Sequence, residues 1–101
     1  MKSPDQCASL ADIRVEIDQL DRQIIALLGK RFAYVKAAAK FKRDATAVKA
    51  PERFTTMLQQ RRDWAVEEGL SPEAIEKVYR DLVNHFIAEE LKQWQDSGTE
   101  R

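Results

Sequence analysis

The sequence predicts an all-α protein with one long helix followed by two shorter helices, and three observations support this fold class. Apolar residues recur at steps of three and four in three separate stretches, which is the period of one helical face. No stretch alternates between apolar and polar residues with the period of two that is typical of strands. The chain has only 3 glycines and 3 prolines, and its 101 residues allow a single domain, 1–101.

The first predicted helix follows a polar tail, residues 1–8, and runs from Ser9 to about Lys42. Ser9 is a favourable N-cap, and Asp12 three residues later forms a capping box with Asp in place of the usual Glu. A helix of about thirty residues is roughly 45–50 Å long, whereas a compact domain of this size is only about 33 Å across. We therefore expect an obligate homodimer, in which a second copy covers the apolar stripe of Leu10, Ile13, Ile17, Leu20, Ile24, Leu27 and Leu28.

Two shorter helices are predicted after residues 43–50, a segment without clear periodicity that we expect to be a loop. Pro51 suits the first turn of the second helix, and Gly69 occupies the position of a left-handed C-cap at its end. The third helix is predicted from an N-cap at Ser71 and a proline at the first helical position, and it should fray around residues 96–98. Its apolar face consists of Ile75, Val78, Tyr79, Leu82, Val83, Phe86, Ile87, Leu91 and Trp94.

The composition indicates a folded helical protein and gives no electrostatic case for binding nucleic acid or membranes. Hydrophobic residues make up 44% and charged residues 34%, and 17 basic residues balance 17 acidic ones. The single cysteine, Cys7, excludes an intrachain disulfide framework. The first residues lack the apolar core of a signal peptide, and no run approaches eighteen apolar residues, so we expect a cytoplasmic protein.

Charged residues interrupt the apolar stripes at four places. Arg14 and Arg31 lie on the first helix, Lys42 lies almost three turns beyond Arg31, and Glu90 extends the stripe of the third helix. Long basic side chains often reach from the edge of a stripe into water, and Glu90 could simply pair with a neighbouring cation. The alternative is a pocket for a small polyanion. Arg14 and Arg31 are roughly 25 Å apart along a helix, so a shared pocket would need Arg14 from the other subunit of an antiparallel dimer.

Other kinds of catalytic site are not supported by the residues present. His85 has no placed nucleophile and no spaced ligand partners for zinc, and a histidine on a helix face is the preferred interpretation. The glycines are scattered and form no phosphate-binding loop. We therefore expect no metal, nucleotide or covalent chemistry and no cofactor.

These residues carry a resemblance to the all-helical chorismate mutase family that covers essentially the whole chain. The stretches concerned are Leu-Ala-Asp-Ile-Arg at Arg14, Gly-Lys-Arg at Arg31, Tyr-Val-Lys-Ala-Ala at Lys36, Phe-Lys at Lys42, Ala-Pro-Glu-Arg at Arg53 and Ile-Ala-Glu-Glu at Glu90. The resemblance implies an intertwined helical homodimer, with Arg14 of one chain meeting Arg31, Lys42 and Glu90 of the other. Mutases of this fold usually place carboxylates where this chain has Ala50 and Phe54, and the family often has Gln at the position of Glu90. The first departure favours a lyase of the same family over a dedicated mutase.

The activity implied by the resemblance is a cofactor-free pericyclic conversion of isochorismate to salicylate and pyruvate for siderophore biosynthesis. Arg14 and Arg31 would bind the two carboxylates, Lys42 would stabilise charge on the breaking ether oxygen, and Glu90 would help only as a protonated donor. The loop at 43–50 would close over the substrate, and Arg53 would anchor that loop. Apolar residues would force a compact substrate conformation, namely Val35, Ala38, Val83, Phe86 and Ile87. The alternatives are the chorismate mutase reaction and a non-enzymatic helical dimerisation module.

Overall fold

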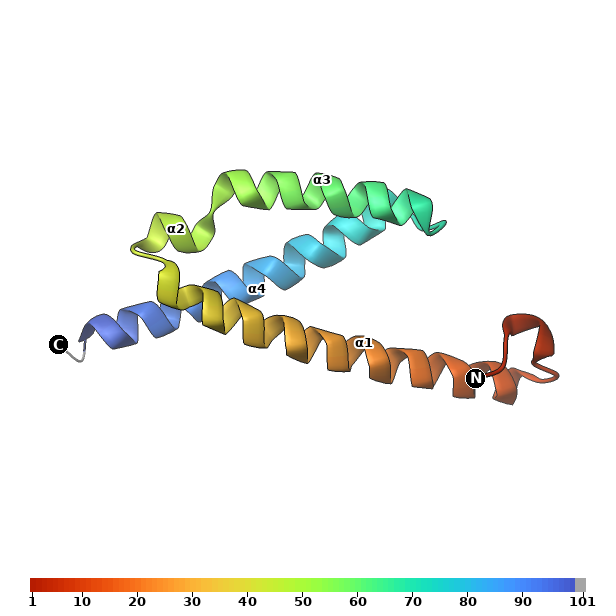
Figure 1. Cartoon of the computed structure of the whole chain (residues 1–101). Coiled ribbons are helices and arrows are strands. Elements are labelled where there is room, and N and C mark those ends of the chain that lie inside the picture. Colours follow the sequence, from red (N-terminus) through yellow and green to blue (C-terminus); the bar gives the residue numbers. More distant parts are fainter. Residues whose placement is uncertain (100–101) are drawn as a thin grey trace. The chain divides into compact units, whose positions relative to one another are not determined.

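The computed structural model describes the backbone of residues 1–99 and the side chains of residues 1–93, and this part of the chain is helical without strands. Three helices, α1 (Leu10–Ala38), α3 (Pro51–Glu67) and α4 (Pro72–Thr99), confirm the predicted all-α class (Figure 1). The prediction that the last helix is short was wrong, because α4 has 28 residues and α1 has 29. A short helix, α2 (Ala45–Lys49), and two 3-10 turns, Pro4–Gln6 and Ala39–Phe41, complete the elements. The chain forms two compact units, Met1–Tyr34 and Val35–Arg101. None of the described helices is long and apolar enough to cross a membrane.

The start of α1 confirms the predicted cap, with one difference in its hydrogen bonds. The Ser9 hydroxyl accepts a bond from the Asp12 amide at 3.1 Å, while the Asp12 carboxylate accepts from the amide of Ala8, one residue before the cap, at 2.9 Å. The first bond satisfies one of the free amides that every helix start leaves, and the second bond fixes the residue that precedes the cap. The far end differs from the prediction, because α1 ends at Ala38 and the chain tightens into a 3-10 turn. Lys42 therefore lies beyond the helix, in extended backbone with φ −97° and ψ 128°.

The segment 43–50, which we expected to be a loop, contains the helix α2. Asp44 is its N-cap, and its carboxylate accepts a bond from the Ala47 amide at 2.8 Å. A helix of 5 residues has little stability of its own, so contacts with the rest of the protein must maintain it. α2 packs against α4, and Val48 is buried with 3% of its surface exposed. The prediction of a loop was wrong because local periodicity does not reveal burial of this kind.

The helices α3 and α4 form an antiparallel hairpin whose turn follows the sequence signals. Gly69 adopts φ 73°, a left-handed conformation that costs glycine nothing. The Gly69 amide donates to Val66 and the Leu70 amide donates to Ala65 at 2.7 Å, which together form a Schellman motif. Ser71 then caps α4 by accepting a bond from the Ala74 amide at 3.2 Å. α4 continues through the region where fraying was predicted, to Thr99, and the side chain of Trp94 lies outside the described residues.

The core of the second unit lies between α3 and α4, and α2 adds to it. The buried apolar side chains of the described residues are Val48, Met57, Leu58 and Ala65. At the edge of this core, the guanidinium of Arg61 lies 4.7 Å from the ring of Trp64 and 5.6 Å from the ring of Tyr79. Such cation–π contacts let a charged residue occupy a position in the apolar stripe.

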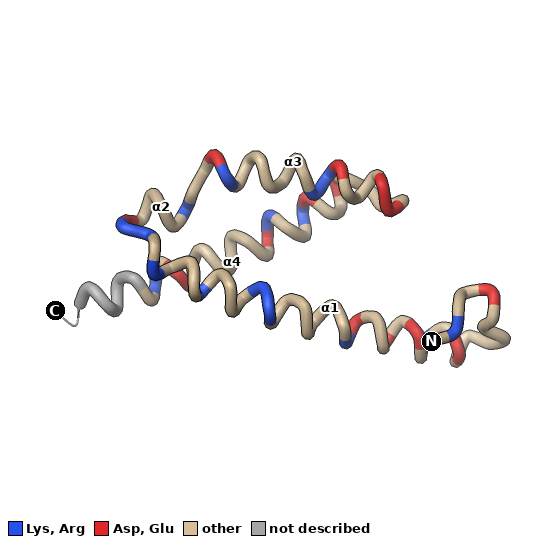
Figure 2. Tube along the Cα trace, in the orientation of Figure 1, with Lys and Arg blue, Asp and Glu red and all other residues tan. Residues whose placement is uncertain are grey.

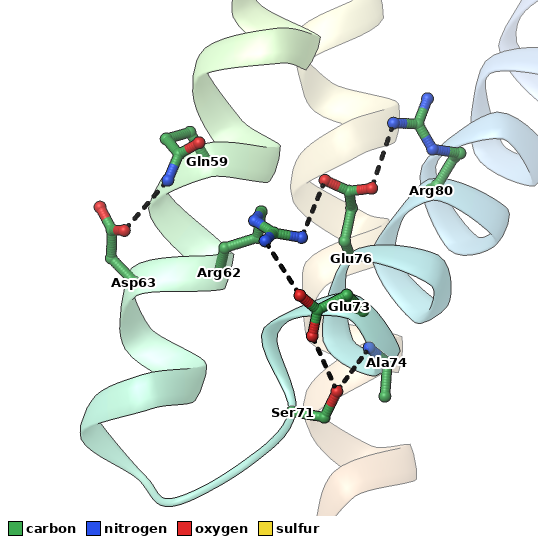
Figure 3. Close-up of polar contacts among 8 residues, drawn as sticks. All are labelled: Gln59, Arg62, Asp63, Ser71, Glu73, Ala74, Glu76 and Arg80. Atoms are coloured by element: carbon green, nitrogen blue, oxygen red, sulfur yellow. Dashed lines mark hydrogen bonds and ion pairs between the residues drawn. The ribbon is translucent and has the colours of Figure 1, made fainter.

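Ion pairs join the outer faces of the hairpin near its turn (Figure 3). Arg62 of α3 reaches Glu73 at 3.4 Å and Glu76 at 3.5 Å, and Glu76 also contacts Arg80 at 3.6 Å. These groups are at least partly exposed, so each pair contributes about 0–1 kcal/mol. The two contacts of Arg62 connect α3 to the beginning of α4, whereas the Glu76–Arg80 pair lies within α4.

Candidate active site

An ion pair between Lys42 and Glu90 is the most unusual feature of the second unit. The Lys42 ammonium donates to Oε2 of Glu90 at 2.8 Å. The side chain of Glu90 is 5% exposed and that of Lys42 is 23% exposed. Glu90 is also the only buried charged residue among the described side chains. Carboxylates are almost never buried unless a cation compensates them, so the pair identifies a place where the protein maintains charge in low dielectric.

Glu90 lies on α4, where its side chain continues the apolar face of that helix. Val83, Phe86 and Ile87 precede it by seven, four and three residues, and each of them is half-buried. Residues at these spacings lie on one side of a helix. The carboxylate is therefore surrounded by apolar surface from its own helix, as the sequence predicted. The prediction left open whether Glu90 pairs with a nearby cation, and the structure shows that it does.

The Lys42–Glu90 pair is a strong electrostatic contact, but a pair of this kind adds little net stability to the fold. At 2.8 Å two unit charges attract by about 6 kcal/mol with an effective dielectric constant of 20. Desolvation of both groups offsets much of this attraction, so buried pairs are often no more stabilising than apolar residues. An ammonium has three donors, and Glu90 occupies one of them. The remaining donors of Lys42 are available to an acceptor on a ligand.

The other predicted site residues are distributed over α1 and α3. Val35 and Ala38 are half-buried in the last turns of α1, and Arg53 is exposed in the first turn of α3. Arg14 is exposed and Arg31 is half-buried, and both belong to the part of α1 in the first unit. They are separated by roughly 25 Å along the helix axis. The structure thus brings Lys42 to Glu90 and keeps Arg14 and Arg31 at separate positions along α1.

Further cations surround Lys42 in the sequence. Lys and Arg follow one another closely in the stretch that joins α1 to α3 (Figure 2), where the basic residues are Lys40, Lys42, Arg43 and Lys49. Lys40, Arg43 and Lys49 are exposed, and none of them pairs with an acidic group of the described residues. This concentration of positive charge attracts anions even though the whole chain has no net charge.

Two residues that hold the segment beside Lys42 were not predicted from the sequence, namely Asp44, which caps α2, and Val48, which is buried. Asp44 precedes the run Ala-Thr-Ala-Val-Lys, and an aspartate before good helix formers is an N-cap signal that could have been recognised. Nothing local marks Val48 as buried. The structure also places His85 on an exposed position of α4, with its ring against Phe86, and finds no cluster of metal-ligating side chains among the described residues.

The described residues thus form a helical protein in which a buried ion pair lies beside a cation-rich segment of the sequence. The chain belongs to the chorismate mutase type II family, whose profile matches residues 13–91. It is 43% identical to the isochorismate pyruvate lyase of Pseudomonas aeruginosa over 97 residues, which is 96% of each chain. It is also 41% identical to the T-protein of Haemophilus influenzae over 83 residues and 33% identical to that of Enterobacter agglomerans over 84 residues. In both cases the match spans only 22% of the T-protein.

Proposed function

We propose that this protein is an isochorismate pyruvate lyase. The observation that carries the proposal is the 43% identity to the Pseudomonas aeruginosa lyase over 96% of both chains. The match to the lyase extends over 96% of both chains, whereas the matches to the T-proteins cover only 22% of those proteins. The family match over residues 13–91 supports the same conclusion, because it includes every residue of the proposed site.

The proposed reaction is a single pericyclic step. The bond between the ring and the enolpyruvyl oxygen breaks, while a hydrogen moves from the ring to the methylene carbon of the departing side chain. The products are salicylate and pyruvate, and no electrons are gained or lost overall. No general base or nucleophile is required, so the protein contributes positioning and electrostatic stabilisation. This suits a site whose described polar groups form an ion pair rather than a nucleophile and base.

Lys42 is the proposed catalytic residue. Its ammonium would donate to the ether oxygen, on which negative charge grows as the bond to the ring lengthens. Glu90 accepts one of the three donors of Lys42 at 2.8 Å, which restricts the direction of the other two. As an acceptor in this pair, Glu90 orients Lys42. The earlier expectation, that a protonated Glu90 donates to the substrate itself, stays a prediction.

The proposed site requires a homodimer. One face of α1 carries five large apolar side chains that are 46–61% exposed in one copy, namely Leu10, Ile17, Leu20, Ile24 and Leu27. Complete burial of such a side chain contributes about 1.5–3 kcal/mol, so a second copy that covers this face would gain substantially. The roughly 25 Å between Arg14 and Arg31 prevents one chain from supplying both to a small ligand. In an antiparallel dimer, Arg14 of one subunit can meet Arg31 and Lys42 of the other.

The guanidinium groups of Arg14 and Arg31 would each bind one substrate carboxylate. A planar guanidinium offers two parallel donors to a carboxylate, which fixes both distance and orientation. Val83, Phe86 and Ile87 would form an apolar wall with Val35 and Ala38, and Arg53 would hold the segment before α3. Cytoplasmic location and a part in siderophore biosynthesis also stay predictions from the sequence.

Chorismate mutase activity is the second candidate, because the family profile that matches the chain is that of chorismate mutase type II. Both substrates are compact dicarboxylates with an enolpyruvyl ether, so one site could accept either. The methyl group of Ala50 cannot bind a substrate hydroxyl, and the ring of Phe54 lies 5.6 Å from the Arg80 guanidinium in a cation–π contact. These two positions favour the lyase as the main activity.

A direct assay tests the proposal. Purified protein is incubated with isochorismate and then, separately, with chorismate, while salicylate fluorescence, pyruvate and prephenate are measured. Salicylate and pyruvate in equal amounts from isochorismate support the lyase. Prephenate from chorismate without salicylate from isochorismate would establish the mutase instead, and no product from either would leave the non-enzymatic dimerisation module. Sedimentation at micromolar concentration tests the dimer, which a stable folded monomer would refute.

A further inference from the structure

The twelve-residue segment 39–50, which we call the strap, has a fixed local conformation. At its start the Lys42 amide donates to Ala39 at 3.2 Å, and in its middle the Asp44 carboxylate accepts from the Ala47 amide at 2.8 Å. At its end the Ala50 amide donates to Thr46 at 2.8 Å. These bonds fall into two groups, at residues 39–42 and at residues 44–50, and only Arg43 separates the two groups along the chain.

Among the described side chains, two of the strap are either buried or held by an ion pair to another part of the second unit. One is Lys42, through its pair with Glu90, and the other is Val48, which is 3% exposed where α2 packs on α4. Most of the other strap residues are exposed, and Phe41 is 84% exposed. The position of Lys42 therefore depends on one polar contact and on one apolar contact six residues away.

We infer that Val48 is a positioning residue for Lys42. Its burial against α4 keeps α2 docked, and because Arg43 alone separates Lys42 from the Asp44 cap of α2, the position of α2 restricts where the backbone of Lys42 can lie. This inference rests on the proposed function, since the ammonium that Val48 positions is the proposed donor to the ether oxygen. Val48 itself touches no substrate in this arrangement.

The values of KM and kcat distinguish a role of Val48 in positioning Lys42 from a general contribution of Val48 to stability. If truncation of Val48 undocks the strap in most molecules, the substrate must first select the docked minority, and its apparent affinity falls by the docked fraction. At saturation the substrate returns every molecule to the docked state, because it binds that state better. The signature is therefore a raised KM with an almost unchanged kcat. A variant that merely unfolds part of the sample lowers the apparent kcat and leaves KM unchanged.

The experiment compares Val48→Ala, Val48→Ile and Thr46→Ala by steady-state kinetics on isochorismate. Val48→Ala should raise KM by about tenfold with kcat within about twofold of the parent chain. Val48→Ile keeps a branched apolar side chain and should stay within about threefold in KM. Thr46→Ala is the matched control, because Thr46 is exposed on the same helix and should leave both constants within about twofold. A fall in kcat at constant KM, or no change in either constant for Val48→Ala, overturns the inference.

Amide hydrogen exchange gives a readout that does not depend on the reaction. Val48→Ala should accelerate exchange at the Ala47 and Ala50 amides, which are bonded within the strap, while the amides of α3 and α4 keep their protection. Equal acceleration of amide exchange throughout the protein, or no acceleration in the strap, contradicts the proposed role of Val48. If the parent protein makes no salicylate, the proposed function fails while the exchange comparison still decides the role of Val48.

Discussion

Removal of the Lys42 ammonium should abolish most of the turnover. Because Lys42 is paired with Glu90, the test must separate lost catalysis from lost stability. A preorganised donor at a developing negative charge contributes roughly 3–4 kcal/mol to transition-state stabilisation, or about a hundredfold to a thousandfold in rate. Lys42→Met keeps much of the aliphatic stem and removes the charge. We therefore expect kcat for salicylate formation to fall by at least about a hundredfold.

The single substitution also leaves a buried carboxylate without its donor. Glu90 is 5% exposed and accepts from the Lys42 ammonium at 2.8 Å, so loss of that ammonium should destabilise the fold by about 3 kcal/mol. For a chain of this size the corresponding fall in Tm is about 12–24 °C. The double variant Lys42→Met/Glu90→Gln replaces the charge by a neutral amide and should recover most of that stability. The cation is absent in both variants, so neither should recover turnover.

Salicylate fluorescence measures kcat for both variants, and thermal unfolding measures their stability. Lys49→Met is the control, because Lys49 is an exposed lysine at the end of α2 that forms no ion pair with the described residues. It should keep turnover within about twofold. The reasoning is refuted if the double variant unfolds near the parent temperature and retains more than a tenth of the parent turnover.

Three further predictions concern other parts of the molecule. Ala50→Gly should raise the Tm, because Ala50 has φ 39°, a left-handed conformation. This conformation costs a residue other than glycine about 1–2 kcal/mol, which exceeds the entropic cost of glycine. A lower Tm would contradict this reasoning. The backbone amide of Glu73 and the Ser71 hydroxyl hold the pKa of the Glu73 carboxyl below its ordinary 4.5. The ionised Glu73 carboxylate therefore stabilises the folded state above pH 4.5, and this stabilisation is lost as pH falls through the lower pKa of the folded state. The Tm difference between parent and Glu73→Gln should therefore vanish in acid, and a difference that is constant with pH would exclude this origin. Finally, an equal mixture of Arg14→Ala and Lys42→Met subunits should regain about a quarter of parent activity after exchange, since half of the dimers then contain one intact site; no recovery would refute a site shared between subunits.

The starts of α1 and α4 and the end of α3 were predictable because they are encoded locally. Ser9 and Ser71 accept the expected amide bonds, and Gly69 adopts the left-handed conformation that only glycine takes without cost. Each of these signals acts within a few residues, so a single sequence contains the information. The pairing of Glu90 with a cation was likewise foreseeable, because a carboxylate within an apolar helical stripe needs a partner.

The strap was not predictable because its structure depends on contacts between distant residues. α2 has 5 residues, too few to form a stable helix alone, and its buried Val48 looks like any exposed valine in the sequence. The same holds for Arg61, which occupies an apolar stripe in α3. Its contacts with Trp64 and with Tyr79 of the opposite helix become visible only when the hairpin is assembled. Local sequence therefore specified the helices, and the tertiary structure specified the segment that positions Lys42.

The charges of the proposed site explain why an acid belongs in a pocket for anions. Arg14, Arg31 and Lys42 supply three positive charges and Glu90 supplies one negative charge, so the site has two positive charges in excess. A substrate with two carboxylates matches that excess, and the filled site is then electrically neutral, which a low-dielectric cavity favours. Without Glu90 the same cations would repel one another more strongly in the empty site. Each product carries a single negative charge, so each matches only half of the excess, and cleavage of the substrate itself weakens the attraction that bound it.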